Sequence, residues 1–404
     1  MHILDSHEFI ELYRGDKDLR IGKILALDYD CTYTVMVPDL QSPADRKILD
    51  EKSKIFSEFM KGFPEKMNFI HYKTHLIYFN RKNISLGGFF QVSLTYFMKL
   101  FKAKRVDLIL ENVYTTFTPR MYMTFFYSIL TKTPVIYVDA GDIPAKGTMK
   151  KFLSKFEKIC IENSKGIIVY NELGSKRYLL EYGISSDRIS VIPKPVDSIE
   201  FNPMVSGADF KTRFSLEDKF VVGYFGRLDA NKGSACLLKV AKELSERNLD
   251  NIIFLFVGGN IENKSSTNFK QILLDYDLPN VVVTGMISHD EMPMAYASTD
   301  IVVFPDITNI PGFPTVLAEA MSMQKPIVAG INGYEEASPL NPEMGLIIPP
   351  RDIGKIIESI LLLKDNPHIR EKFGLNCRKF VELNMDYDKV VHKYYALFLK
   401  AVAK

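Results

Sequence analysis

Two positive charges follow a strand-like run in the second half of the chain. Phe220 to Phe225 is a short apolar run typical of a buried strand, and residues 226–233 after it read GRLDANKG. Gly226 lets the chain turn sharply, while Arg227 and Lys232 bring two fixed positive charges to the end of the strand. Such a pair either binds an anion or is the solvated surface of a turn, as most arginines and lysines near turns are.

A second candidate for anion binding lies in residues 301–330, IVVFPDITNIPGFPTVLAEAMSMQKPIVAG. Residues 301–304 and 327–329 are strand-like, and a helix is predicted between them. This helix opens at Gly312, Phe313, Pro314, Thr315 and Val316. A strand–loop–helix–strand unit belongs to an open parallel sheet, which binds ligands where such a helix begins. Unpaired N–H groups at a helix start favour an anion such as a diphosphate.

Glu319 is the one carboxylate inside this predicted helix. It lies one turn beyond Thr315, among apolar residues expected to pack on the sheet. A carboxylate in that position needs a partner. It either reaches solvent or pairs with a lysine, or it accepts hydrogen bonds from two adjacent hydroxyls such as those of a ribose.

The run GFPTVLAEAMSMQKPIV resembles the donor-binding motif of retaining family 4 glycosyltransferases, in which two glutamates flank a Gly-Phe-Gly/Pro turn. Glu319 matches the second glutamate, which in that family holds the ribose of the nucleotide. Pro311 stands where the first glutamate is expected, and that carboxylate usually contacts the transferred sugar. Residues 226–233 are similar to the family's Gly-Arg-Leu-(x)3-Lys-Gly motif, whose two cations bind the donor diphosphate. The resemblance therefore implies catalytic roles for Arg227 and Lys232.

Two further glycines follow strand-like runs. Gly258 follows residues 252–257, and Gly285 follows residues 281–283, in positions where glycine allows close approach of the backbone to a ligand. The resemblance covers roughly residues 100 to 400, in several linked motifs in one order. It implies the following donor-binding residues: Gly226, Gly258, Gly285, Gly312, Phe313, Pro314, Thr315, Val316 and Glu319.

The first half of the chain offers fewer candidates. Gly15 lies in a loop that, in the resembled family, faces the cleft. Asp139 and Asp142 follow the strand-like residues 135–138. These aspartates could contact the sugar or the acceptor, or Asp142 could cap the following turn.

The resemblance implies an α/β protein of the GT-B fold, with two facing doubly wound Rossmann-like domains and a C-terminal helix that crosses back to the first. Pro193 and Pro195 exclude helix from residues 187–203, which we interpret as the hinge. We expect residues 1–197 to form the acceptor-binding domain, residues 198–384 the nucleotide-sugar-binding domain, and residues 385–404 the returning helix.

Composition limits the class of protein. With 404 residues, 47% of them apolar and 25% charged, the chain suits two globular domains. Four cysteines without CxxC spacing indicate a reducing compartment and no zinc site: Cys31, Cys160, Cys236 and Cys377. The N-terminus lacks a signal-peptide pattern, and the most apolar run, residues 113–130, is interrupted by Pro119 and Arg120. We therefore expect a cytoplasmic protein, either free or peripheral at the inner face of the membrane.

Residues 51–165 hold 19 Lys and Arg against 9 Asp and Glu, which favours an anionic partner. The amphipathic residues 146–161 are either a domain helix with a solvated lysine face or a helix at an anionic membrane surface. Residues 89–105 are predicted to form a core helix whose exposed edge could touch lipid. Nucleic acid is disfavoured, because the sequence contains no known binding motif for it.

The expected activity is hexosyl transfer, with retention of configuration, from a nucleoside-diphosphate sugar to a glycan or lipid-linked acceptor. We expect no metal and no cofactor, because the two cations and the helix start would stabilise the leaving diphosphate. The sequence contains neither GxxxxGK[ST] nor GxGxxG, and it shows no evident pair of acids for a hydrolase. The alternatives are a non-catalytic sugar-nucleotide-binding protein and a nucleotide-sugar epimerase of the same fold.

Overall fold

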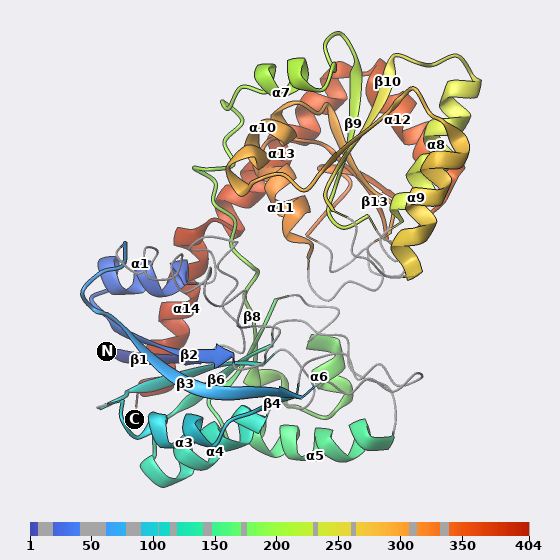
Figure 1. Ribbon diagram of the computed structural model, residues 1–404. Coiled ribbons are helices and arrows are strands. Elements are labelled where there is room, and N and C mark those ends of the chain that lie inside the picture. The colour runs from blue at the N-terminus through green and yellow to red at the C-terminus, as the bar shows by residue number, and fades with distance from the viewer. Residues whose placement is uncertain are drawn as a thin grey trace. The chain divides into compact units, whose positions relative to one another are not determined.

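A computed structural model describes residues 1–6, 19–40, 62–77, 90–103, 105–113, 119–139, 148–170, 176–228, 233–259, 264–306, 313–331 and 339–403. The chain forms two compact units (Figure 1). Unit 1 comprises Met1–Ile192 and Val391–Lys404, and unit 2 comprises Pro193–Val390. The functional division predicted at residues 197 and 385 stays a prediction.

Unit 2 is built on a six-stranded sheet in which each described pair of neighbouring strands is parallel. Its strands, in spatial order, are β11 (Val281–Gly285), β10 (Ile252–Val257), β9 (Phe220–Phe225), β12 (Ile301–Phe304), β13 (Ile327–Gly330) and β14 (Gly345–Ile348). Numbered along the chain, the strands thus lie in the spatial order 3-2-1-4-5-6 of a doubly wound sheet, and this order reverses between β9 and β12.

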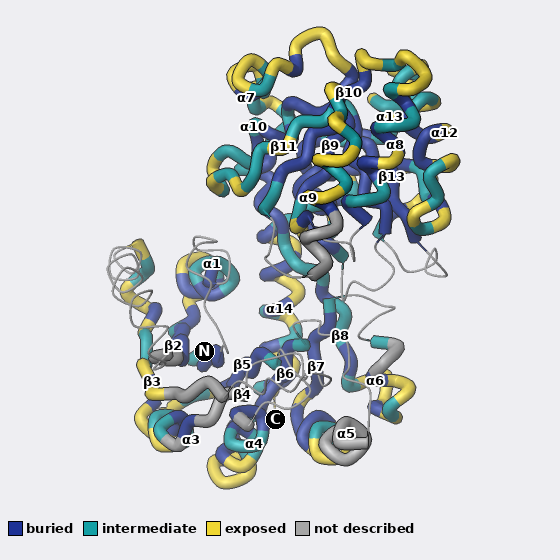
Figure 2. Tube along the Cα trace, turned by 45° about the vertical axis from the view of Figure 1, so that its right-hand side comes forward, coloured by how far each residue is buried: buried dark blue, intermediate teal, exposed yellow. Residues whose placement is uncertain are grey.

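Helices cover both faces of this sheet (Figure 1). One layer contains α8 (Ser234–Glu246), α9 (Lys264–Tyr276) and α12 (Ile353–Asp365). The other contains α7 (Ala208–Arg213), α10 (Met292–Ala297), α11 (Thr315–Ser322) and α13 (Pro367–Asn384). Strands β9, β10, β12 and β13 are buried along their whole length, as Figure 2 shows. Their continuous apolar runs follow from this, because no residue of a doubly covered strand faces water.

Unit 1 contains an eight-stranded sheet within the described residues. In spatial order its strands are β4 (Phe90–Val92), β3 (Met67–Ile77), β2 (Thr32–Leu40), β1 (His2–Ser6), β5 (Leu108–Val113), β6 (Val135–Asp139), β7 (Gly166–Val169) and β8 (Ile189–Val191). β4 pairs antiparallel with β3, and the other pairs are parallel. The order reverses between β1 and β5.

Helices α3 (Leu94–Leu100), α4 (Pro119–Thr131) and α5 (Thr148–Glu162) form one layer over this sheet (Figure 1). On the opposite face lie α1 (Arg20–Asp28) and the C-terminal part of α14 (Tyr387–Val402), where Tyr29 and Tyr395 are in ring contact at 4.5 Å. The short helix α6 (Arg177–Glu181) precedes β8. Among the described residues, no helix combines the length and the apolar character needed to cross a bilayer.

The prediction of one helix over residues 89–105 is wrong in its first part. The chain forms strand β4 there, and α3 begins only after Ser93. The Ser93 hydroxyl accepts a hydrogen bond from the Tyr96 N–H at 3.0 Å, which caps the helix.

Arg378 of α13 fixes the segment at the start of unit 2. Its Nη1 donates hydrogen bonds to the carbonyls of Ser198 (2.9 Å), Phe201 (2.8 Å) and Ser322 (3.0 Å). The Val196 N–H also donates to the Met385 carbonyl at 2.9 Å. Prolines keep this segment out of helix, so its carbonyls need such partners from outside.

We expect Arg378→Ala to lower the free energy of unfolding by about 3 kcal/mol, because three buried carbonyls lose a charged donor. Arg378→Lys should recover only part of this loss, since the lysine side chain is one bond shorter and its ammonium group does not reach the position of Nη1. Arg247→Ala is the control, because Arg247 forms a half-exposed pair with Glu243 on α8. Urea unfolding of the full chain measures all three variants, and equal losses for Arg378→Ala and Arg247→Ala would contradict the assignment.

Candidate active site

Arg227 lies just beyond the carboxyl end of β9, where the strand order of unit 2 reverses. Doubly wound sheets bind ligands at this point. The Arg227 side chain is exposed, while Leu228 after it is buried and donates its N–H to the Gly259 carbonyl at 3.2 Å. A methyl group placed on Gly233 would lie 2.8 Å from Pro305 Cβ, so the start of α8 packs against the end of β12. The predicted cation-bearing loop therefore begins and ends at the reversal point.

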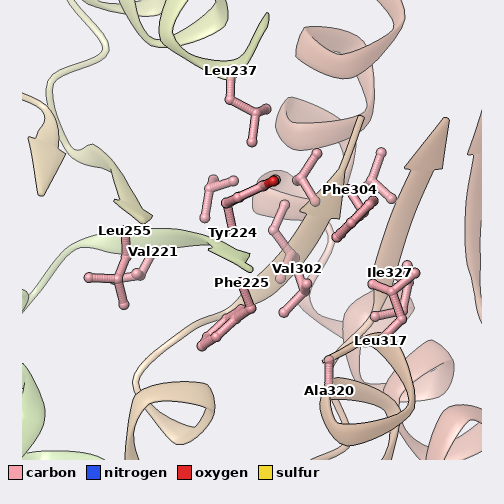
Figure 3. Packing of buried hydrophobic residues seen from close by; sticks show 14 of the residues in the cluster. Val221, Tyr224, Phe225, Leu237, Leu255, Val302, Phe304, Leu317, Ala320 and Ile327 are labelled. Carbon is pink, nitrogen blue, oxygen red and sulfur yellow. The ribbon is translucent and has the colours of Figure 1, made fainter. Parts of the chain in front are cut away.

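The last two residues of β9 are aromatic and point to opposite faces of the sheet (Figure 3). Tyr224 packs on the side of Leu237, and its ring stacks on Phe304 with the centroids 5.6 Å apart. Its hydroxyl donates a hydrogen bond to the Arg227 carbonyl at 2.9 Å. The turn that carries Arg227 is thus tied to the core of the sheet.

Phe225 faces the other layer, where it stacks on Tyr296 of α10 with the ring centroids 3.9 Å apart. The Tyr296 hydroxyl lies 3.0 Å from Glu319 Oε2 and 2.9 Å from the Val316 carbonyl. Burial first, and the Glu319 carboxylate second, raise the pKa of the Tyr296 phenol well above its usual value. The Tyr296 phenol therefore stays protonated, and its O–H can donate a hydrogen bond to the Glu319 carboxylate.

Glu319 is only 5% exposed, so it is not a solvated surface glutamate. Its place on α11 is fixed by the helix itself and by Tyr296. Sequence reasoning identified Glu319 but missed Tyr296, because the two residues are 23 positions apart and only the packing of α10 on α11 brings them together.

The predicted helix start is confirmed, with bounds slightly later than expected. Pro314 is the N-cap of α11, with φ −60° and ψ 127°, and its side chain provides no capping hydrogen bond. Thr315 is exposed, Phe313 and Val316 are half-buried, and Pro314 is buried. The Leu317 N–H donates to the Pro314 carbonyl at 3.0 Å, so the N–H groups of Thr315 and Val316 are the ones that precede the hydrogen-bond ladder of the helix.

Gly258 follows β10, the strand beside β9, and Gly285 ends β11, the next strand in the sheet. Gly258 has φ +147°, and a Cβ there would lie 1.9 Å from the Gly226 carbonyl oxygen. Its N–H donates to the Gly285 carbonyl at 3.0 Å. The predicted glycines at residues 226, 258 and 285 therefore occupy neighbouring strand ends along one edge of the sheet.

Several predicted site residues lie outside the described residues: Gly15, Asp142, Lys232 and Gly312, together with Pro311. Asp139 is described, and it ends β6 in register with Val113.

A charged pair at the end of β12 was not predicted. Asp306 is 7% exposed, and its Oδ2 lies 2.7 Å from Nε of Arg351. The Arg351 N–H also donates to the Pro305 carbonyl at 2.9 Å. These bonds fix the point from which the chain leaves β12 toward α11.

Unit 1 has a buried polar cluster at its own reversal point, between β1 and β5. The Glu111 carboxylate accepts hydrogen bonds from Tyr96 (2.8 Å) and Thr124 (2.7 Å), and it lies 3.4 Å from Arg120. Burial raises the pKa of Glu111, and Arg120 opposes that shift. In the part of the chain that the structure describes, no three His, Cys, Asp or Glu side chains gather in a way that could hold a metal ion.

Two doubly wound sheets, with C-terminal residues returning to the first unit, define the GT-B class of fold. The crystal structure of HepE from Anabaena in complex with UDP has this fold, with a TM-score of 0.75 and 16% identity over 99% of this chain and 100% of that chain. Residues 207–380 match the family model of glycosyl transferases group 1. Most of unit 2 is thus a distant member of that family.

Two relatives show how far the sequence similarity extends. The capsular polysaccharide biosynthesis glycosyltransferase CapM of Staphylococcus aureus is 32% identical over 169 residues, which is 41% of this chain and 42% of CapM. The UDP-Gal:alpha-D-GlcNAc-diphosphoundecaprenol alpha-1,3-galactosyltransferase of Escherichia coli is 27% identical over 62% of this chain and 64% of its own length. The chain thus spans less than two thirds of either relative.

We expect Gly258→Ala to lower the free energy of unfolding by about 3 kcal/mol or more, because the new Cβ clashes with a carbonyl as well as straining the backbone. Gly285→Ala is the matched control. Gly285 also has a positive φ, +74°, but a Cβ there meets no atom within 4 Å. Gly285→Ala should lower the free energy of unfolding by only about 1 kcal/mol. Thermal unfolding compares the two, and equal costs would show that the strand ends do not approach so closely.

We expect Tyr296→Phe to cost about 1–3 kcal/mol of unfolding free energy, because a buried carboxylate loses a donor. Tyr137→Phe is the control, since the Tyr137 hydroxyl is buried without a hydrogen-bond partner among the described residues. Its removal should be neutral or stabilising. If urea unfolding shows no difference between the two variants, Tyr296 does not hold Glu319.

Proposed function

We propose that the chain is a retaining glycosyltransferase that moves a hexose from a nucleoside-diphosphate sugar to a glycan or lipid-linked acceptor. The strongest support for this proposal is the position of Arg227 and α11 in the sheet of unit 2. Within unit 2, Arg227 follows the first of the two strands at which the sheet order reverses, and α11 follows the second. Both are therefore at the edge where doubly wound sheets bind nucleotides.

In this proposal the donor diphosphate binds Arg227, Lys232 and the N–H groups at the start of α11. An arginine presents several donors to phosphate oxygens, and a helix start adds a partial positive charge. Glu319 accepts hydrogen bonds from the ribose hydroxyls, and Tyr296 positions Glu319. Gly226, Gly258 and Gly285 leave room for the nucleotide along the strand ends.

The reaction breaks the bond between the anomeric carbon and a diphosphate oxygen, which keeps the electron pair. The acceptor hydroxyl oxygen forms the new bond to that carbon from the same face, and its proton goes to the departing phosphate oxygen. Negative charge thus grows on the diphosphate, where fixed cations stabilise the transition state more than the ground state. We propose that this stabilisation makes a metal ion unnecessary.

The names of similar proteins suggest which donors and acceptors to test. HepE binds UDP in its crystal structure, and the Escherichia coli relative is named for UDP-Gal and a diphosphoundecaprenol-linked acceptor. We propose UDP-sugars as first donors and lipid-linked glycans as first acceptors. The acceptor would bind unit 1, with contributions from Gly15, Asp139 and Asp142, at the cytoplasmic face of the membrane.

Transfer of labelled sugar from UDP- and GDP-sugars to cell-membrane extracts tests the proposal. We expect Arg227→Ala and Lys232→Ala each to lower kcat/KM about 100-fold, because each removes one stabiliser of the leaving diphosphate. Arg247→Ala, at the exposed arginine that follows α8, should leave the rate unchanged, and a chelator should also leave it unchanged.

Other outcomes would favour other functions. Tight nucleotide binding without transfer or donor hydrolysis would indicate a non-catalytic binding protein. Conversion of the donor sugar without an acceptor would indicate an epimerase. Loss of activity in chelator would contradict the metal-free mechanism, and unchanged kinetics in both Arg227→Ala and Lys232→Ala would contradict the site.

A further inference from the structure

The outer side of the helix layer of unit 1 carries large apolar side chains. On α3, α4, α5 and the residue after α3, seven of them are between 45% and 62% exposed. They define what we call the α3–α5 face: Met98, Phe101, Phe126, Ile129, Leu130, Phe156 and Ile159. Single exposed apolar residues are common, but a cluster on adjacent helices marks an interaction surface.

Helix α4 shows most clearly that this face is unlike an ordinary solvated surface. Its sequence, PRMYMTFFYSILT, contains one charged residue, Arg120. That residue is 1% exposed and points inward to Glu111, at 3.4 Å. The outward side of α4 therefore has no charge and presents Phe126 and Ile129 instead. A helix that borders water normally places charged residues on its outer side, whereas one that is apolar all round borders an apolar phase.

Aromatic contacts join the three helices into one continuous surface. The ring of Phe97 lies 5.9 Å from that of Phe126, which links α3 to α4. The ring of Tyr122 lies 6.5 Å from that of Phe156, which links α4 to α5. Figure 1 shows these helices side by side on one face of the sheet. The exposed residues are thus parts of one patch.

Exposed basic residues lie on the same helices or shortly after them: Lys102, Arg105, Lys132, Lys155 and Lys165. Residues 94–105 contain four Lys and Arg and no acidic residue, and residues 119–132 add Lys132, again with no acidic residue. Residues 148–165 contain five lysines against Glu157 and Glu162. Glu162 lies 3.7 Å from Lys158, which offsets its charge. An apolar patch accompanied by exposed basic residues matches the interface of an anionic bilayer, where acyl chains lie beneath negative head groups.

We propose that the α3–α5 face docks unit 1 onto an anionic phospholipid bilayer. A second copy of the chain fits this face less well, because a symmetric contact would bring the two sets of basic residues together. The docking surface would hold a transferase next to lipid-linked acceptors, but it does not depend on that activity.

The chain contains no tryptophan, so a single introduced tryptophan reports on one position. Phe126→Trp in the full chain is titrated with vesicles of phosphatidylcholine and phosphatidylglycerol. We expect its emission to shift to shorter wavelength and to be quenched by brominated lipid. Leu383→Trp is the control, since Leu383 is 59% exposed on α13 of unit 2 and its tryptophan should show neither effect.

Charge and apolar variants test the two parts of the surface separately. We expect Phe126→Glu with Ile129→Glu to weaken vesicle binding by about tenfold or more. Leu375→Glu with Leu383→Glu, on exposed positions of α13, should leave binding unchanged. Lys102→Gln with Lys132→Gln should weaken binding and reduce its dependence on salt. Circular dichroism and thermal unfolding of each variant show whether it is folded.

Unchanged Phe126→Trp emission in a folded protein would overturn the proposal. The proposal would also be overturned if the protein bound vesicles of phosphatidylcholine alone as tightly as those with phosphatidylglycerol. Equal losses of vesicle affinity in the double variants of α4 and of α13 would overturn it too. A shift of Phe126→Trp emission that grows with protein concentration without lipid would assign the face to a second copy instead. Nucleotide binding is measured in the same preparation, so failure of the docking proposal and failure of the transferase proposal are seen independently.

Discussion

The alternation of side chains at the end of β9 is the constraint on which the candidate site depends. Two neighbouring aromatic residues reach opposite helix layers because they are successive residues of one strand. Tyr224 holds the carbonyl of the turn that carries Arg227, while Phe225 packs Tyr296 against Glu319. A register shift of one residue would exchange the two rings and disconnect both candidate site residues, Arg227 and Glu319, from the core.

Burial makes this arrangement rigid. Tyr224, Phe225 and Tyr296 are each at most 1% exposed, so none of these rings can turn away without opening a cavity. The Asp306–Arg351 pair fixes the end of β12 in a comparable way. The exposed Arg227 side chain is therefore attached to a backbone that is held from several directions. An anion site gains from such preorganisation, because little reorganisation remains to be done when charge develops.

The sequence predicted those parts of the fold whose signal is local. The bounds of β9, β10 and β12 are those predicted, because strands covered on both faces are continuous apolar runs with polar ends. Strand β3 was missed, since its mixture of polar and apolar residues lacks that run. Helix α4 looked like an interrupted apolar segment, because the charge of Arg120 cannot be assigned to the protein interior without its partner Glu111.

The candidate site divides in the same way. Motif residues such as Arg227 and Glu319 stand out because each lies in a short characteristic run. The contact of Tyr296 with Glu319, and the pair of Asp306 with Arg351, depend on which helices and loops the sheet brings together. No local pattern records such contacts, so only the three-dimensional arrangement reveals them.

The most direct test of the account compares the affinity of the full chain for a nucleoside diphosphate with that for the bare nucleoside. Calorimetry of UDP against uridine, and of GDP against guanosine, removes the phosphates while keeping the base and ribose. If Arg227, Lys232 and the start of α11 bind the diphosphate, at least one pair should show the diphosphate bound about 100-fold more tightly. Equal affinity within both pairs, or no binding of either diphosphate, would contradict the account.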